Sequence, residues 1–210
     1  MSEPEGVSTP HSAERWDERY SGERVWSGHP NEALVAEATE LGVGRALDVG
    51  SGEGADAVWL ACRGWRVTAL DISPKAVQRT EAMAAEAGVQ VEGFAAGLLE
   101  AALPDASYDL VSAMYPALLR TATGEAERRL LDLVAPGGTL LVVHHADIDR
   151  DHALAHGCDP DDYVSPEDVR TMAVERGGWD VVTHERRERT ITLSAGAHHK
   201  DDLVLRLRRP

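Results

Sequence analysis

The stretch from Arg45 to Ser73, RALDVGSGEGADAVWLACRGWRVTALDIS, constrains the fold of this chain more than any other segment. Ala46 to Val49 is a short apolar run, interrupted by Asp48, that leads into Gly50 and Gly52, so the pattern predicts a buried strand that ends in a tight turn. Glycine permits turn dihedrals and a close approach of the backbone. We therefore expect main-chain N–H groups of this turn to be free to face a negatively charged group.

A helix and a second strand follow the glycine-rich turn. Glu53 to Arg63 has helical periodicity, and Gly64 is typical of a helix end. Trp65 to Leu70 then predicts a strand, with Asp71 at its carboxyl end. Open α/β sheets bind ligands at that end of their strands. An acid there can accept hydrogen bonds from two ribose hydroxyls, so the stretch predicts a nucleoside site.

Two nucleoside cofactors fit this outline. Gly50, Gly52 and Ala55 satisfy the pattern G-x-G-x-x-G/A, and Asp71 lies at about the ~20-residue spacing of a dinucleotide site. That match is weak on its own.

Acidic residues around the turn favour the other cofactor. Asp48, Glu53 and Asp56 would repel a pyrophosphate. S-adenosylmethionine carries no phosphate, and its ammonium and sulfonium groups are compatible with nearby carboxylates. The acids therefore favour S-adenosylmethionine over NAD.

Three motifs resemble a known family, the class I S-adenosylmethionine-dependent methyltransferases. LDVGSGEG at Leu47–Gly54 resembles the glycine-rich first motif of the family, and ALDIS at Ala69–Ser73 resembles its acidic motif. WDERYSGERVWSGHPN at Trp16–Asn31 is similar to the tellurite-resistance and thiopurine methyltransferase branch. The resemblance extends from about Trp16 to the end of the chain. It implies an α/β, Rossmann-like fold: a seven-stranded, mostly parallel sheet with helices on both faces and an antiparallel strand near the C-terminus.

The resemblance also implies which residues hold the cofactor. Trp16 and Tyr20 are spaced i, i+4, and in the family this N-terminal segment is a lid over the cofactor. The alternative is that these aromatic residues only fix the segment to the core. The candidate cofactor-binding residues are Trp16, Tyr20, Trp26, Asp48, Gly50, Ser51, Gly52, Asp71, Ile72, Leu98 and Met114.

One position departs from the family pattern. After the third strand, predicted at Val89–Phe94, the family commonly has an acid that contacts the adenine amino group, and Gly97 stands there in this chain. The backbone of Leu98 or the side chain of Glu100 could take over this contact, and the sequence leaves both open.

Further elements follow from periodicity, caps and breakers. We expect helices over residues 31–41, 73–87, 121–134 and 165–177, a fourth strand from Ser107, a fifth over Thr139–Val143 after the turn Pro136–Gly138, and two antiparallel strands at 180–192 and 203–207. Arg186, Arg187 and Arg189 are predicted to lie on a solvated face.

Candidate catalytic residues lie at two strand ends. The fourth strand delivers Met114 and Tyr115, and the fifth delivers His144 and His145. A neutral oxygen or nitrogen acceptor must lose a proton, and histidine suits this task near neutral pH. Adjacent strand residues point to opposite faces, so only one of the two histidines should enter the pocket. Tyr115 could orient the acceptor. A histidine at a strand end can instead form only a local hydrogen bond within the protein. A thiolate or chalcogen acceptor needs no general base.

The segment from His144 to Asp162 is rich in histidine and aspartate. Such side chains can ligate a divalent metal. No compact ligand spacing is present, so we predict no metal and interpret the segment as a solvated loop that shapes the substrate site.

Length and charge limit the remaining possibilities. The 210 residues predict one domain at 12–210, with lid and docking helices at 12–42, after a flexible tail at 1–11. The net charge of −15 disfavours nucleic-acid binding. No signal peptide or membrane-length apolar run is present, so we expect a cytoplasmic monomer or homodimer without membrane association. The two cysteines give no disulfide framework, and Cys62 is expected in the core.

The preferred hypothesis is a methyltransferase that transfers a methyl group from S-adenosylmethionine to a small-molecule O, N, S or chalcogen acceptor by in-line displacement. The alternatives are an NAD-dependent oxidoreductase and a protein that binds S-adenosylmethionine without transferase activity. Arsenite is disfavoured as an acceptor because its chemistry requires several thiolates.

Overall fold

The computed structural model describes residues 12–155, 159–190 and 199–210. The predicted tail at residues 1–11, as well as His156, Cys158 and His198, lies outside the described residues. The elements are α1 (Ala13–Arg19), α2 (Glu32–Ala38), β1 (Arg45–Val49), α3 (Ala55–Cys62), β2 (Arg66–Asp71), α4 (Pro74–Glu86), β3 (Val91–Ala95), β4 (Tyr108–Met114), α5 (Glu125–Leu133), β5 (Val134–His145), α6 (Arg150–Ala155), the 3₁₀ turn η1 (Pro160–Asp162), α7 (Pro166–Arg176), β6 (Asp180–Glu188) and β7 (Asp201–Arg208).

These strands form one seven-stranded sheet in the order β3-β2-β1-β4-β5-β7-β6. Strands β1 to β5 run parallel, whereas β7 is antiparallel to both β5 and β6. The predicted Rossmann-like, mostly parallel sheet with antiparallel strands near the C-terminus is confirmed.

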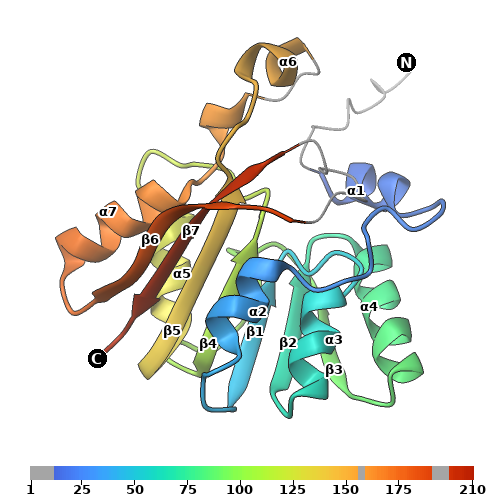
Figure 1. Ribbon diagram of the computed structural model, residues 1–210. Coiled ribbons are helices and arrows are strands. Elements are labelled where there is room, and N and C mark those ends of the chain that lie inside the picture. Colours follow the sequence, from blue (N-terminus) through green and yellow to red (C-terminus); the bar gives the residue numbers. More distant parts are fainter. Residues whose placement is uncertain (1–11, 156–158, 191–198) are drawn as a thin grey trace, which may run out of the picture.

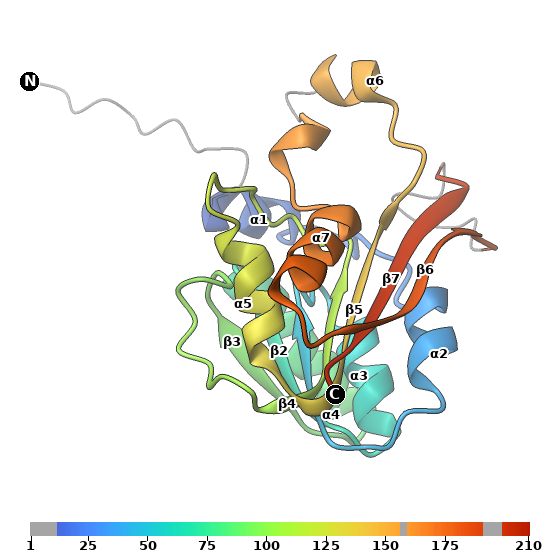
Figure 2. The same ribbon diagram turned by 90° about the vertical axis from the view of Figure 1, so that its left-hand side faces the viewer.

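Helices cover both faces of the sheet (Figures 1 and 2). Apolar residues of α2 and α3 pack on one face, and those of α5 and α7 pack on the other. Strand residues alternate between the two faces. In β5, Leu141 and Val143 face α2 and α3, and Leu140 and Val142 face α5 and α7.

Polar caps begin two of the helices as the sequence predicts. The Ser73 hydroxyl accepts the N–H of Ala76 at the start of α4, and Pro74 occupies the first turn. Ser165 and Asp168 form a reciprocal capping box at the start of α7.

Strand β5 begins at Val134, which is earlier than the predicted Thr139. The glycine pair after Pro136 continues in the sheet, because the Gly137 N–H donates to the Arg209 carbonyl and the Arg209 N–H donates to the Gly138 carbonyl. The predicted turn at Pro136–Gly138 therefore lies within β5, and the strand was predicted to start too late, since its partner Arg209 is far along the chain and leaves no local signal.

Two predictions about exposure were also wrong. Cys62 is exposed at the last position of α3 rather than buried in the core. Arg187 does not lie on a solvated face, because its guanidinium pairs with the buried Glu37 carboxylate at 2.5 Å and connects β6 to α2. No helix in the described part of the chain is long and apolar enough to span a membrane.

Candidate functional site

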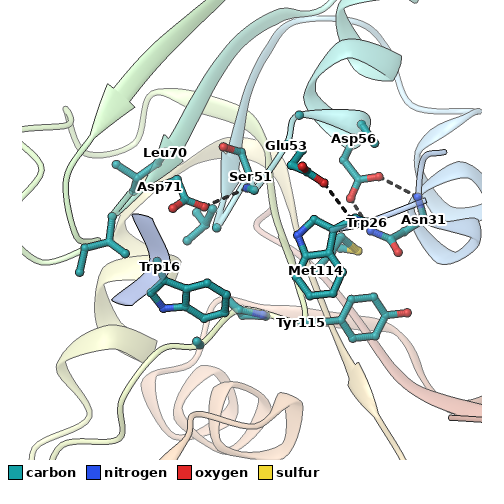
Figure 3. A pocket seen from close by; sticks show the side chains of 18 of the residues that line it. Trp16, Trp26, Asn31, Ser51, Glu53, Asp56, Leu70, Asp71, Met114 and Tyr115 are labelled. Atoms are coloured by element: carbon teal, nitrogen blue, oxygen red, sulfur yellow. Dashed lines mark hydrogen bonds between the residues drawn. The ribbon is translucent and has the colours of Figure 1, made fainter. Parts of the chain in front are cut away.

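A cavity of about 390 Å³ lies at the carboxyl ends of the parallel strands. This is within the range of small-molecule sites. Its floor comes from the glycine-rich turn after β1, the end of β2 and the loop after β3, and its side walls come from the ends of β4 and β5. The N-terminal segment that contains α1 contributes further lining residues, which form the cover of the cavity, and Figure 3 labels two of them, Trp16 and Trp26. Among its lining residues are Trp16, Arg19, Tyr20, Trp26, Asn31, Gly50, Ser51, Gly52, Asp71, Ile72, Leu98, Met114, Tyr115, His145 and Arg189.

The backbone N–H groups of the glycine-rich turn are already used inside the protein. The Gly50 and Ser51 N–H groups donate to the Leu70 carbonyl at 2.8 and 3.1 Å, and the Gly52 N–H donates to Asp71 Oδ2 at 2.9 Å. The expectation that these groups are free to face an anion was therefore wrong. A turn whose donors are used in this way does not provide the N–H cradle that a pyrophosphate needs, which argues against a dinucleotide.

Asp71 at the end of β2 is the acid best placed for a nucleoside. Its Oδ1 accepts the Ser73 N–H at 2.9 Å and its Oδ2 accepts the Gly52 N–H, which leaves each oxygen a lone pair for a ribose hydroxyl. Burial raises the pKa of Asp71 above its usual value, and these two N–H donors oppose that rise. Ser51 beside it carries a buried hydroxyl with no hydrogen-bond partner among the described residues, so it is available to a ligand. The donor set fits S-adenosylmethionine.

The other acids near the turn hold the N-terminal segment. The Glu53 carboxylate accepts the N–H groups of Val25 and Trp26 and pairs with Arg79. The bond to Trp26 is visible in Figure 3. The Glu53 carboxylate lines the cavity, but protein groups already engage it.

Asp56 at the start of α3 has the same role. It accepts the backbone N–H of Asn31 at 2.7 Å and the Asn31 side-chain amide at 2.6 Å. Burial raises the pKa of Asp56, and these two bonds oppose that rise. Protein groups therefore already bind both acids, and the occupied N–H groups of the turn disfavour a pyrophosphate more strongly than these acids do.

Asp48, which was expected to bind the cofactor, is not among the residues that line the cavity. It is buried, and Ser112 donates a hydrogen bond to its Oδ1 at 3.2 Å. Burial raises the pKa of Asp48 well above its usual value, and the neighbouring Asp56 adds to the rise. A contact of Asp48 with the cofactor stays a prediction.

Aromatic residues form the cover of the cavity. The rings of Trp16 and Tyr20 stack with 6.0 Å between centroids, as their i, i+4 spacing suggests. The Trp26 indole N–H donates to the Tyr20 hydroxyl at 3.1 Å, and the Arg19 guanidinium lies over both tryptophan rings. All four residues line the cavity.

The loop after β3 supplies the wall next to Asp71. Gly97, Leu98 and Ile72 line the cavity, and the Glu100 carboxylate fills the space that a side chain on Gly97 would occupy. Glu100 itself is not among the lining residues. The contact of Leu98 or Glu100 with an adenine stays a prediction.

A polar cluster forms the opposite wall. Tyr115, which directly follows β4, has a left-handed φ of 52°, a strained conformation that often marks functional sites. Its hydroxyl donates to the buried Asp202 carboxylate at 2.7 Å, and burial together with this acid raises its pKa. His145 stacks on the Tyr115 ring with 4.3 Å between centroids, and its Nδ1 lies 3.3 Å from Asp202 Oδ1.

The two neighbouring histidines lie in different surroundings. His145 lines the cavity, whereas the half-buried His144 lies on the α5 and α7 side of β5 and does not. Burial lowers the pKa of His144 to about 4, and His144 Nε2 has no hydrogen-bond partner among the described residues. Of these two histidines, only His145 is therefore accessible to a ligand in the cavity.

The histidine- and aspartate-rich segment forms α6 and η1 rather than an irregular loop. Arg150 pairs with Asp159 and Asp161 and connects these two elements. Within residues 12–155, 159–190 and 199–210, no three histidine, cysteine, aspartate or glutamate side chains gather as metal ligands.

Sequence reasoning missed three charged residues of the site. Arg19 and Arg189 line the cavity, and Asp202 lies behind the wall that contains Tyr115. Arg189 was expected on a solvated face, but its side chain is only 11% exposed and pairs with Asp202 at 3.6 Å. The polar and apolar alternation of β7 does not indicate a role for Asp202, because that role depends on the pairing of β7 with β5, which brings Asp202 next to His145.

Comparisons with known proteins agree with this fold. Residues 46–138 match a family model described as a methyltransferase domain. An uncharacterized methyltransferase of Mycobacterium tuberculosis is 38% identical over 112 residues, which are 53% of this chain and 56% of that protein. Ribosomal protein L11 methyltransferase of Thermus thermophilus is 37% identical over 111 residues, 52% of this chain and 42% of that protein. The chain thus spans about half the length of the curated relatives it matches.

Solved structures share the whole architecture. The N-methyltransferase NodS of Bradyrhizobium japonicum, in complex with S-adenosylhomocysteine, aligns with a TM-score of 0.70 at 20% identity and covers 95% of this chain and 99% of that one. The chain therefore has the class I methyltransferase fold, with a methyltransferase-domain match over residues 46–138.

Proposed function

We propose that the protein is an S-adenosylmethionine-dependent methyltransferase for a small-molecule O, N, S or chalcogen acceptor. One observation carries the proposal: a single cavity joins a nucleoside-binding edge, formed by Gly52 and Asp71, to a polar wall that contains Tyr115 and His145. The cofactor, when bound, supplies a methyl group on a positively charged sulfur. The protein supplies alignment, which is worth roughly 7–11 kcal/mol of barrier.

The residues of the cavity divide into two groups by chemistry. Asp71 and Ser51 offer hydrogen-bond partners to a nucleoside, and Leu98 and Ile72 offer an apolar wall to a base. Met114, at the end of β4, lies between these residues and the polar wall. An acceptor would then lie near Tyr115 and His145, which makes His145 the candidate general base and Tyr115 the candidate orienting group.

The tellurite-resistance and thiopurine branch is supported by the N-terminal segment, where the stacked Trp16 and Tyr20 and the bonded Trp26 cover the cavity. We place the chain in this branch as part of the same proposal. A chalcogen or sulfur acceptor would use the aromatic cover without need of a base.

A protein acceptor is a second candidate, because a relative is by its name a ribosomal protein L11 methyltransferase. The size of the cavity favours a small molecule. An NAD-dependent oxidoreductase is disfavoured by the occupied N–H groups at Gly50 and Gly52. Binding of S-adenosylmethionine without turnover remains the alternative from outside the transferases.

The test is S-adenosylhomocysteine release. The protein is incubated with S-adenosylmethionine and panels of phenols, amines, thiols, selenite and tellurite, in parallel with a ribosomal protein fraction, and the product is measured by mass spectrometry. We expect release with one small-molecule panel. Release with the protein fraction alone would overturn the small-molecule proposal, and tight binding without release under any condition would favour a non-catalytic binder.

A matched pair of variants checks the site. For a hydroxyl or amine acceptor, His145→Gln should lower kcat on the order of 10²–10⁴-fold, as loss of a general base does. His144→Gln should leave kcat nearly unchanged, since His144 lies outside the cavity. Equal effects of both variants would contradict the role of His145.

A further inference from the structure

Three side chains of the cavity wall converge on one buried carboxylate. Asp202, in β7, is 5% exposed. Its Oδ2 accepts the Tyr115 hydroxyl at 2.7 Å and lies 3.6 Å from Arg189 Nε, and its Oδ1 lies 3.3 Å from His145 Nδ1. Asp202 is not among the lining residues, although its three partners are. It can therefore act on a ligand only through them.

The Nδ1 atom of His145 faces two groups with opposite demands. An ionised carboxylate can only accept a hydrogen bond, so Asp202 Oδ1 requires a proton on Nδ1. Arg189 can only donate, and its Nη1 lies 3.1 Å from the same Nδ1 atom, which would then have to be unprotonated. One ring nitrogen cannot form both hydrogen bonds, so the bond that forms determines the tautomer of His145.

The number of available partners decides this competition. Among the described residues, His145 Nδ1 is the hydrogen-bond partner of Asp202 Oδ1, and a buried carboxylate oxygen without a donor is costly. Arg189 has five N–H donors and also lies next to Asp202 Oδ2 and over the Tyr115 ring. Donation from His145 to Asp202 therefore satisfies both residues, whereas donation from Arg189 to Nδ1 leaves Oδ1 unsatisfied.

We propose that Asp202 is a positioning residue that holds His145 as the Nδ1–H tautomer and leaves Nε2 as the proton-accepting atom of the site. This inference rests on the proposed function. The proton of a hydroxyl or amine acceptor passes to Nε2, and the resulting imidazolium carries an N–H on both ring nitrogens. The negative charge of the neighbouring Asp202 carboxylate stabilises this positive charge.

The surroundings of the ring fit this role. The imidazole of His145 lies between the Tyr115 ring at 4.3 Å and the His199 ring at 3.9 Å, so its plane is fixed from both sides. The His199 Nδ1 atom in turn lies 3.2 Å from the Asp147 carboxylate. Both faces of the ring are therefore covered by side chains that have charged partners of their own.

The test is the tautomer of His145 in solution. The full chain is labelled with ¹⁵N at the histidine rings, and the Nδ1 and Nε2 resonances are recorded at pH 8.5, where an ordinary imidazole is neutral. The signals of His145 are assigned by their loss in His145→Gln. We expect a protonated Nδ1 and an unprotonated Nε2. A protonated Nε2, or an equal mixture of tautomers, would overturn the proposal.

Two variants separate positioning from folding. Asp202→Asn should switch the tautomer, because a carboxamide can donate to Nδ1 while it accepts from Tyr115; a comparable exchange in a Ser-His-Asp triad imposes the wrong tautomer. Asp201→Asn is the matched control, since the neighbouring Asp201 pairs with the exposed Arg186. An unchanged tautomer in Asp202→Asn would contradict the proposal. If that variant fails to fold, the wild-type spectrum still decides.

The outcome is separable from that of the proposed function. Calorimetric titration with S-adenosylhomocysteine on the same samples reports cofactor binding, and we expect Asp202→Asn to retain it within about threefold, since Asp202 does not line the cavity. If wild-type protein has the Nδ1–H tautomer but no affinity for S-adenosylhomocysteine, the methyltransferase proposal is refuted. The tautomer then has no role in methyl transfer. Binding with the Nε2–H tautomer would refute the role of Asp202 alone.

Discussion

The Glu53 carboxylate accepts the backbone N–H of Trp26 at 2.8 Å, and this bond joins the glycine-rich turn to the segment that covers the cavity. The same carboxylate holds Val25 and pairs with Arg79, whose guanidinium also reaches the Gly22 and Glu23 carbonyls. Hydrogen bonds and an ion pair therefore connect the glycine-rich turn and α4 to the segment that covers the cavity.

Glu53→Ala should release this cover. Hydrogen bonds to a charged group contribute about 1.5–3 kcal/mol each, so hydrogen exchange at the Val25 and Trp26 amides should quicken by at least about tenfold. Affinity for S-adenosylhomocysteine should fall as well. Glu86→Ala, at the exposed end of α4, serves as the control. Unchanged exchange at Trp26 would show that the cover is held by other contacts.

Gly54→Ala should destabilise the fold. Gly54 has a φ of 89°, and a Cβ there would lie 2.7 Å from Thr80 Cα and 2.8 Å from its Oγ1. We expect a loss of roughly 2–4 kcal/mol in the free energy of unfolding, the sum of left-handed strain and overpacking. Urea denaturation measures it.

Gly88→Ala separates these two causes, since Gly88 also has a positive φ of 70° but no atom within 4 Å of the added Cβ. It should cost only about 1–2 kcal/mol. Equal losses for the two variants would contradict the importance of the contact with Thr80.

His144 should make the protein sensitive to acid. Burial lowers its folded pKa to about 4, below the unfolded value of about 6.5, so the unfolded chain binds the proton first as pH falls. The resulting stability is full above pH 6.5 and is lost as pH falls towards 4, about 2 kcal/mol of it by pH 5.

His144→Gln removes this titration. Urea unfolding at pH 7 and pH 5 should show a smaller pH-dependent loss in the variant, by about 2 kcal/mol. His184→Gln, at an exposed histidine, is the control. An equal loss in wild type and His144→Gln would show that other groups cause the acid sensitivity.

Local sequence patterns predicted much of the fold. The strand, glycine turn and helix at the start of the core, the Ser73 and Ser165 caps, and the antiparallel strands at the end each carry a signal within a few residues. The aromatic spacing of Trp16 and Tyr20 also predicted a shared face.

Features that depend on distant partners were not predictable in this way. The N–H groups of Gly50 and Gly52 are used by the end of β2, the acids Glu53 and Asp56 by the N-terminal segment, and Arg189 by Asp202. The sequence shows the chemistry of each of these residues. The role of each also depends on a second residue, distant in the sequence, that the fold brings into contact with it.

The most direct test of the central claim is calorimetric titration with S-adenosylmethionine, S-adenosylhomocysteine and NAD, on wild type, Asp71→Ala and the control Asp201→Asn. We predict binding of the first two ligands but not of NAD, a loss of at least about tenfold in Asp71→Ala because its carboxylate faces the nucleoside site, and no change in Asp201→Asn. Binding of NAD alone, or undiminished S-adenosylhomocysteine binding by Asp71→Ala, would contradict the account.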